Sequence, residues 1–181
     1  MYILIGMNTH IVALGISVES ISARGLQACE EATELVCAEI GIDGKEHFLI
    51  PAAANAWGRL RSVAISEGIT LFIVSAFRSI DRQAEIVRQK LETGVAINDI
   101  LIVCAPPGYS EHHTGRAVDL STPGSQVLEA EFDQTTAYAW LTRRAREFGY
   151  RLSYPVGNPF GYQYEPWHWC FHDTQAGSTE G

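Results

Sequence analysis

Two short peptides rich in histidine and acidic residues constrain this sequence more than any other feature. They are SEHHTGRAVD, residues 110–119, and EPWHW, residues 165–169. Imidazole nitrogens and carboxylate oxygens are common zinc ligands, and a catalytic zinc site uses three protein ligands and leaves a fourth position open. His112, Asp119 and His168 form such a set. A fold that uses all three must bring two distant peptides to one point.

The spacing within the first peptide predicts a turn. On a helix, positions seven apart lie about 10.5 Å apart along the axis, too far to share one ion. On a strand, His112 and Asp119 would face opposite sides, because side chains alternate between the faces. The chain must therefore turn between them, and Gly115 is the residue that permits the turn.

The second peptide predicts a bend as well. Glu165 precedes His168 by three residues, so an unbroken strand would point the two side chains apart. Pro166 favours an extended conformation for Glu165, and we expect a bend or bulge at Pro166–Trp167 that turns both side chains into one pocket. Since three other residues hold the metal, Glu165 is free to act as a general base on a water molecule.

Charge supports these roles. A zinc ion with one carboxylate ligand keeps one positive charge, which an ionised Glu165 neutralises. Arg78, at the end of the apolar run 69–76, then supplies one spare positive charge, suited to an anionic substrate or a developing oxyanion. The chain as a whole has a net charge of −8. This net charge argues against nucleic acid as its main partner, because binding to phosphate backbones requires a basic surface.

The hydrophobic pattern predicts one α+β domain. A chain of 181 residues with 46% hydrophobic content is long enough for one sizeable core. Helices and strands are mixed without a regular alternation, which favours α+β over α/β. A long loop around a short apolar piece is expected at 95–115. The expected helices are 26–40, 52–67, a segment capped by Ser79 and ending at Gly94, and a segment from an Asp133 cap to Phe148; the expected strands are 69–76, 116–121, 150–154 and 167–171.

Other classes of protein are disfavoured. No apolar run has the length of a membrane span, and residues 1–7 lack the basic and long apolar regions of a secretory signal. The four cysteines form no CxxC pair, which argues against a zinc ribbon or a thioredoxin-like motif. Cys29 and Cys37, on one predicted helix, lie too far apart to pair. A Cys104–Cys170 disulfide remains open.

The two peptides also carry a family resemblance. SEHHTGRAVD matches the motif SxHxxGxAxD and EPWHW matches ExxHW. The sequence thus resembles the D-alanyl-D-alanine carboxypeptidases related to VanY, in the wider group that includes lysostaphin-type peptidases and hedgehog domains. The resemblance implies an antiparallel sheet with helices packed outside and a zinc cleft over the sheet. It covers about residues 48–172, with 1–47 as an N-terminal extension packed on this domain and 173–181 as a disordered tail.

The resemblance also implies a role for each residue of the site. In the family segment that contains Arg78, the tyrosine usual before the arginine is replaced by Phe77, which removes a hydroxyl group. By resemblance, one zinc ion is held by His112, Asp119 and His168, Glu165 is the catalytic base, Arg78 binds the scissile carbonyl or the substrate carboxylate, and Gln83 and Ser110 help to hold the substrate.

The function implied is a zinc-dependent D,D-carboxypeptidase that removes the terminal D-alanine of peptidoglycan stem peptides or their precursors. An L,D-carboxypeptidase or a peptidoglycan endopeptidase would use the same residues and remains open. A non-catalytic zinc-binding interaction domain is a further alternative, but such a site needs neither Glu165 nor Arg78. The substrate class suggests the cell envelope, while the lack of a visible export signal leaves a cytoplasmic role open. The oligomeric state is not indicated.

Overall fold

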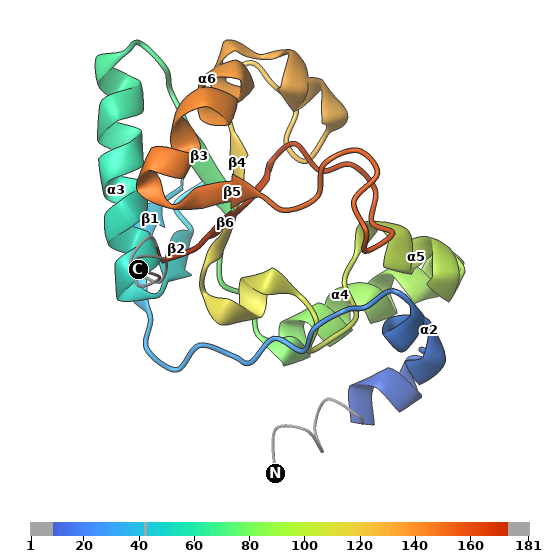
Figure 1. The fold of residues 1–181 in the computed structure, drawn as a ribbon. Helices are drawn as coiled ribbons and strands as arrows, with labels where there is room; N and C mark the ends of the chain where they lie inside the picture. Colours follow the sequence, from blue (N-terminus) through green and yellow to red (C-terminus); the bar gives the residue numbers. More distant parts are fainter. Residues whose placement is uncertain (1–8, 42, 174–181) are drawn as a thin grey trace, which may run out of the picture.

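The computed structural model describes residues 9–41 and 43–173, which form a mixed helical and sheet structure (Figure 1). The expected disordered tail lies outside this range apart from Asp173, and so does the apolar start at residues 1–7. The elements in chain order are α2 (Val18–Ala23), β1 (Val36–Ile40), β2 (Glu46–Leu49), α3 (Pro51–Ser66), β3 (Phe72–Ser75), α4 (Ile80–Glu92), α5 (Ile97–Val103), η1 (Glu111–Thr114), β4 (Ala117–Ser121), η2 (Ala130–Gln134), α6 (Thr136–Arg144), η3 (Ala145–Phe148), β5 (Tyr150–Leu152) and β6 (His168–Phe171).

The central sheet has four antiparallel strands in the order β3-β4-β6-β5, which confirms the α+β prediction. β1 and β2 form a separate antiparallel hairpin. Glu39 of β1 links the hairpin to the sheet, because its buried carboxylate accepts hydrogen bonds from the Ile73 backbone N–H of β3 and from Trp57 Nε1, both at 3.0 Å.

The main core lies between one face of the sheet and helices α3 and α6 (Figure 1). Val118 and Leu120 of β4 belong to this core, together with Trp57 of α3 and Trp140 of α6. Because side chains alternate along a strand, Asp119 points to the opposite face of the sheet. Because Val118 and Leu120 pack into the core, the polar side chain of Asp119 lies on the face of β4 away from it.

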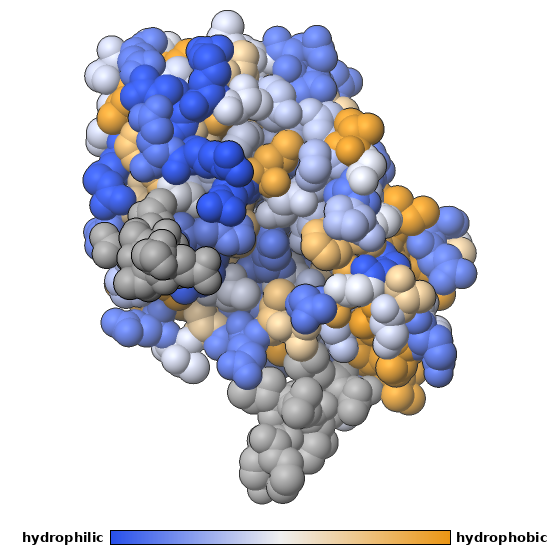
Figure 2. Space-filling model, in the orientation of Figure 1, coloured by the Kyte–Doolittle hydropathy of each residue, from blue (hydrophilic) through white to orange (hydrophobic). Residues whose placement is uncertain are grey.

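A second, smaller core lies among α2, α4 and α5, which Figure 1 shows grouped together beside the sheet. It includes Ile21 of α2, Val87 of α4 and Ile100 of α5, all buried. Figure 2 shows hydrophobic residues, in orange, gathered on this side of the molecule, where Val18 and Ile102 are exposed. Within the described residues no helix combines the length and hydrophobicity needed to cross a bilayer.

The helix predicted at 26–40 is wrong. Residues 26–35 run without regular secondary structure and 36–40 form strand β1. The backbone of this segment bonds to another part of the chain. The Cys29 and Ala32 N–H groups donate to the carbonyls of Gly108 and His113, both at 2.8 Å. Hydrogen bonds to a distant loop thus replace those of a helix. We call residues 26–35 the strap.

Two further predictions need correction. Residues 95–115 are not one long loop, since 97–103 form α5 with Ile100 and Leu101 buried in the second core. The helix expected to start at Asp133 starts later: the side chain of Thr135 caps α6 by accepting from the Tyr138 N–H at 3.1 Å, while Asp133 lies in η2. The end of the predicted helix differs as well, because residues 145–148 form the 3-10 helix η3 and not a continuation of α6.

The helix predicted at 52–67 is confirmed as α3, with Pro51 in its first turn. Ser79 caps α4 as predicted, because its hydroxyl accepts from the Arg82 N–H. All four predicted strands are present, each shorter than expected at one or both ends. Cys104 and Cys170 are both free thiols. The disulfide between them that the sequence left undecided is therefore not formed.

Gly115 is a position in this fold where a side chain is expected to be costly. Its φ is +63°, and a Cβ there would lie 2.9 Å from Leu35 Cδ2 and 3.1 Å from Ile50 Cγ2. We expect Gly115→Ala to lower the free energy of unfolding by about 2–4 kcal/mol, from left-handed strain and overpacking together. Gly124→Ala is the matched control, because φ is +85° but a Cβ would meet nothing within 4 Å. Equal losses in urea unfolding would contradict the overpacking argument.

Candidate metal centre

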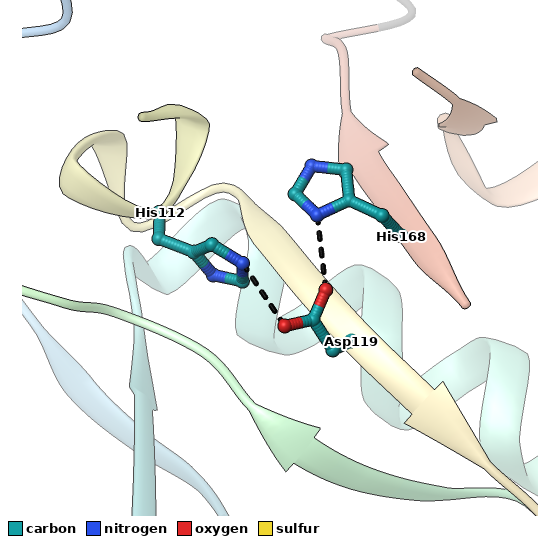
Figure 3. Close-up of side chains that lie close together, drawn as sticks. All are labelled: His112, Asp119 and His168. Carbon is teal, nitrogen blue, oxygen red and sulfur yellow. Dashed lines mark hydrogen bonds and ion pairs between the residues drawn. The ribbon is translucent and has the colours of Figure 1, made fainter. Parts of the chain in front are cut away.

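Three buried side chains from separate elements meet on the polar face of the sheet (Figure 3). His112 comes from η1, Asp119 from β4 and His168 from β6. One ligand atom from each lies within 4.8 Å of the other two. Asp119 Oδ2 is 3.1 Å from His112 Nε2, and Asp119 Oδ1 is 2.9 Å from His168 Nδ1. The structure therefore brings together the three residues predicted to bind metal.

Backbone geometry places each of these ligand atoms. Gly115, in the left-handed conformation, ends η1 and turns the chain into β4, as the spacing predicted. Asp119 and His168 are direct partners in the β4–β6 register, so their side chains lie next to each other. His112 Nδ1 donates to the Ala76 carbonyl at 2.7 Å, which leaves Nε2 to face Asp119.

This donor set fits a zinc ion. Two imidazole nitrogens and one carboxylate are typical of zinc, whereas magnesium and calcium prefer oxygen ligands alone. Burial opposes the charged form of His168, but hydrogen bonds to Asp119 and Glu111 raise its pKa to about 10. A metal at Nδ1 must displace a proton, so its affinity is expected to rise with pH.

Glu165 faces the same cavity as the three ligands. The His168 N–H donates to the Glu165 carbonyl at 3.1 Å, which closes a turn over Pro166 and Trp167 and confirms the predicted bend. Burial raises the pKa of the Glu165 carboxyl to about 7, partly opposed by the positive charge of His168. A carboxyl with a pKa near neutrality can accept and return a proton at the same pH, which is the property of a general base.

Arg78 reaches the site from the loop after β3. Its guanidinium donates to Gln83 Oε1 at 2.8 Å and to Ser75 Oγ at 3.0 Å, and Nη2 lies 3.8 Å from Asp119 Oδ2. Gln83 is itself buried and donates to the Ala105 carbonyl at 2.7 Å. The polar atoms of Gln83 are thus engaged within the protein, and Gln83 supports Arg78 directly.

The cavity in front of these residues has a volume of about 470 Å³. Ser110 lines it, and its hydroxyl makes no hydrogen bond to another described residue. Tyr154 also lines it, with its ring centroid 4.8 Å from that of His168. Lys90 of α4 and Glu129, which follows β4 along the chain, lie at its edges and are exposed. The three proposed metal ligands that line the cavity, Glu165 and Arg78 therefore face one common space.

His113 stabilises the segment that carries the ligand His112. Its Nδ1 donates to the Arg78 carbonyl at 2.6 Å and its Nε2 accepts from the Gly108 N–H at 3.1 Å. Both ring nitrogens of His113 are therefore engaged with the backbone and not with the three proposed metal ligands. Burial lowers its pKa to about 4 from 6.5, so its contribution to stability is complete above pH 6.5 and is lost as the pH falls towards 4.

We expect His113→Ala to lower the free energy of unfolding at pH 7.5 by about 2–4 kcal/mol, because the buried Gly108 N–H and the partly buried Arg78 carbonyl lose their partners. The variant should also lose less stability than the wild type between pH 6.5 and pH 4, since it lacks the group whose pKa is lowered. Urea unfolding across this range measures both effects. The exposed His172→Ala is the control, expected within about 0.5 kcal/mol of the wild type; an equally small change for His113→Ala would contradict the argument.

Glu111 is a residue of the site that the sequence did not predict. Its Oε2 lies 2.9 Å from His168 Nε2 and accepts a hydrogen bond from Ser153 Oγ at 2.6 Å. Glu111 precedes a predicted ligand in the first peptide, but its contact with His168 depends on the pairing of β4 with β6. The only signal in the sequence was a carboxylate next to His112.

Comparison with known proteins places the chain in a family. The VanY family, described as D-alanyl-D-alanine carboxypeptidase, matches residues 46–174. The YodJ protein of Bacillus subtilis (strain 168) is 32% identical over 146 residues, which is 76% of this chain and 53% of YodJ. The chain thus spans about half the length of that relative.

Solved structures agree with this assignment. The LdcB LD-carboxypeptidase is 29% identical with a TM-score of 0.73, over 81% of this chain and 71% of LdcB. The vancomycin-resistance D,D-pentapeptidase VanY of the VanB-type cassette, solved in complex with Zn(II), is 25% identical with a TM-score of 0.60, over 77% of this chain and 79% of VanY. With the sheet, the helices and the His-Asp-His site in the arrangement described, the chain belongs to the VanY family of D-alanyl-D-alanine carboxypeptidases.

Proposed function

We propose that this protein is a zinc-dependent carboxypeptidase that removes the terminal D-alanine of peptidoglycan stem peptides or their precursors. One observation carries the proposal: three buried zinc-type ligands, a carboxyl with a pKa near 7 and an anchored guanidinium face the same cavity. A metal that served structure alone would need neither Glu165 nor Arg78. The family match to residues 46–174 supports the substrate class.

In the proposed mechanism each residue has a separate task. His112, Asp119 and His168 would hold the ion. When bound, zinc acts as a Lewis acid that polarises the scissile carbonyl and makes water acidic enough to be deprotonated near neutral pH. Glu165 takes the proton from the attacking water and later returns it to the leaving amine.

Arg78 stabilises negative charge in this mechanism. Two of its partners, Gln83 and Ser75, fix the guanidinium, and its remaining N–H groups are available to the cavity. They can bind the terminal carboxylate of the peptide or the oxyanion that forms at the scissile carbonyl. Ser110, with a hydroxyl that has no partner among the described residues, is proposed to bind the peptide backbone.

The proposed catalytic unit is residues 48–172, with the preceding segment packed on it. The strap contacts the loop around Gly108 and His113, next to the proposed ligand His112. These contacts are hydrogen bonds from the Cys29 and Ala32 backbone N–H groups. Glu31 supports the same region, because its carboxylate accepts from the Ile80 N–H at the start of α4. The N-terminal segment therefore contributes contacts near the site although it supplies none of the proposed catalytic residues.

The rate is expected to rise with pH through the ionisation of Glu165. Burial raises the pKa of this carboxyl to about 7, and only its ionised form accepts a proton. Since a bound cation favours the ionised form, kcat/KM should reach half its maximum at a pH no higher than about 7. Steady-state rates between pH 5 and pH 9 with zinc-loaded protein measure the profile. A kcat/KM that falls as the pH rises from 5 to 7, or that reaches half its maximum only above about pH 8, would contradict the role of Glu165.

A second candidate is an L,D-carboxypeptidase, which removes D-alanine from the L-residue of a tetrapeptide. The similarity to the LdcB LD-carboxypeptidase, at a TM-score of 0.73, favours it. The catalytic residues would be the same, because the two reactions differ only in the residue before the scissile bond. The discrimination between them therefore has to come from substrates.

The test incubates zinc-loaded protein with three peptides and follows released D-alanine. They are a pentapeptide ending in D-Ala-D-Ala, a tetrapeptide ending in L-Lys-D-Ala, and the pentapeptide with its terminal carboxylate amidated. The proposal expects cleavage of the first, with a large loss on amidation, because Arg78 then loses its anionic partner. Protein treated with a chelator serves as the control and should recover its activity on addition of zinc.

The outcomes separate the candidates. Cleavage of the tetrapeptide alone would establish the L,D-carboxypeptidase in place of the D,D-enzyme. Cleavage of the amidated peptide at an undiminished rate would favour an endopeptidase. Cleavage of none of the peptides by zinc-loaded protein would overturn the proposed enzyme and leave a zinc-binding interaction domain.

A further inference from the structure

We propose that Glu111 is a positioning residue for the metal centre, which holds the His168 ring in the orientation and tautomer that metal binding requires. This inference rests on the proposed zinc site and adds a residue to it. The observation behind it is that the two nitrogens of His168 have different acidic partners: Nδ1 lies 2.9 Å from Asp119 Oδ1, and Nε2 lies 2.9 Å from Glu111 Oε2.

The geometry places Glu111 outside the group of metal ligands. The two nitrogens of an imidazole point in different directions, and His168 directs Nδ1 towards Asp119, which also contacts His112. The Glu111 carboxylate lies on the Nε2 side of the ring. A metal bound by the three ligands would therefore lie next to Nδ1, and Glu111 would act on that metal only through the ring.

The chemistry of imidazole gives this contact its role. A neutral histidine carries one N–H, and a metal at Nδ1 requires that the proton be on Nε2. Glu111, as an ionised acceptor, favours the proton on Nε2 and fixes the rotation of the ring. A carboxylate behind a metal-bound histidine also makes the ring a stronger donor to the metal.

Glu111 is itself held in place. Ser153, in the segment after β5, donates to Glu111 Oε2 at 2.6 Å, and the Ser153 N–H lies within 3.4 Å of the His168 carbonyl. The Glu111 side chain is 28% exposed, whereas the His168 side chain is 4% exposed. Ser153 thus limits the movement of Glu111 away from the ring towards solvent.

The experiment measures zinc affinity of the full chain by competition with a chromophoric chelator, together with the visible spectrum of the cobalt-substituted protein. We expect Glu111→Ala to weaken zinc binding about 10- to 100-fold. Glu111→Gln should lose less, because its amide oxygen still accepts the Nε2–H. Ser153→Ala, which leaves the carboxylate but removes one of its partners, should weaken binding about 2- to 10-fold. Glu92→Ala, at the exposed end of α4, is the matched carboxylate control and should bind zinc as the wild type does.

Activity gives a second measurement. Glu111→Ala should be inactive at limiting zinc and recover at saturating zinc, because the ligands and Glu165 are unchanged. Thermal unfolding of the metal-free variants separates a loss of affinity from a loss of folding, and Ser153→Ala keeps the test decisive if Glu111→Ala does not fold.

Three results would overturn the inference. Wild-type zinc affinity and an unchanged cobalt spectrum in Glu111→Ala would show that the ring needs no carboxylate behind it. Equal losses in Glu111→Gln and Glu111→Ala would contradict the hydrogen-bond role. A wild-type protein that binds no zinc would overturn the proposed function together with this inference, whereas the first two results overturn the inference alone.

Discussion

Glu165→Gln is expected to lower kcat by about 100- to 10,000-fold, the usual contribution of a general base. The amide has almost the shape of the carboxylate but cannot take a proton from water. Burial gives the Glu165 carboxyl a pKa of about 7, so the native group can both accept and return a proton near neutral pH. KM should change little, because Arg78 and the metal ligands remain in place.

Zinc affinity is the control that makes this result specific. Since Glu165 is not among the three ligands, Glu165→Gln should bind zinc within a few-fold of the wild type. Glu92→Gln, on the exposed end of α4, is the matched substitution and should keep full activity. If Glu165→Gln keeps the wild-type kcat while Glu92→Gln behaves as expected, Glu165 is not the base.

Asp119→Ala is expected to weaken zinc binding by more than about 100-fold, beyond the loss typical of residues that only support a ligand. Asp119 contacts both histidine ligands and is the one carboxylate among the three. Burial alone would raise the pKa of this carboxyl, but His112 and His168 hold it well below its usual range. It is therefore ionised and ready to bind a cation at any pH at which the enzyme would work.

The measurement is the same chelator competition, followed by the rate of D-alanine release. Activity should be absent at zinc concentrations that saturate the wild type. Asp99→Ala, an exposed position on α5, is the control and should match the wild type in both measurements. Unfolding of the metal-free variant shows whether the buried site still folds. A folded Asp119→Ala protein with wild-type zinc affinity would contradict the assignment of the metal centre.

Local sequence signals predicted several elements correctly because their causes are local. Pro51 begins α3, where its missing N–H costs nothing, and the Ser79 hydroxyl caps α4. Gly115 turns the chain between His112 and Asp119 because a positive φ is least costly for glycine. In each case one residue and its near neighbours decide the conformation.

The errors have non-local causes. The apolar spacing at 26–40 is compatible with a helix, but these residues hydrogen-bond to the loop around Gly108 and His113 and then pair with β2. The free energy of those contacts exceeds the modest preference that spacing alone provides. The α5 helix similarly forms where Ile100 and Leu101 can enter the second core.

The sequence by itself determined the chemistry of this protein: two histidines, an aspartate, a glutamate and an arginine in peptides that suit a zinc peptidase. Only the tertiary structure decided that they meet. The register of β4 with β6 sets Asp119 beside His168, and the same pairing brings Glu111 to the far side of the His168 ring. Strand register depends on the packing of the whole sheet against α3 and α6, so no local pattern could specify it.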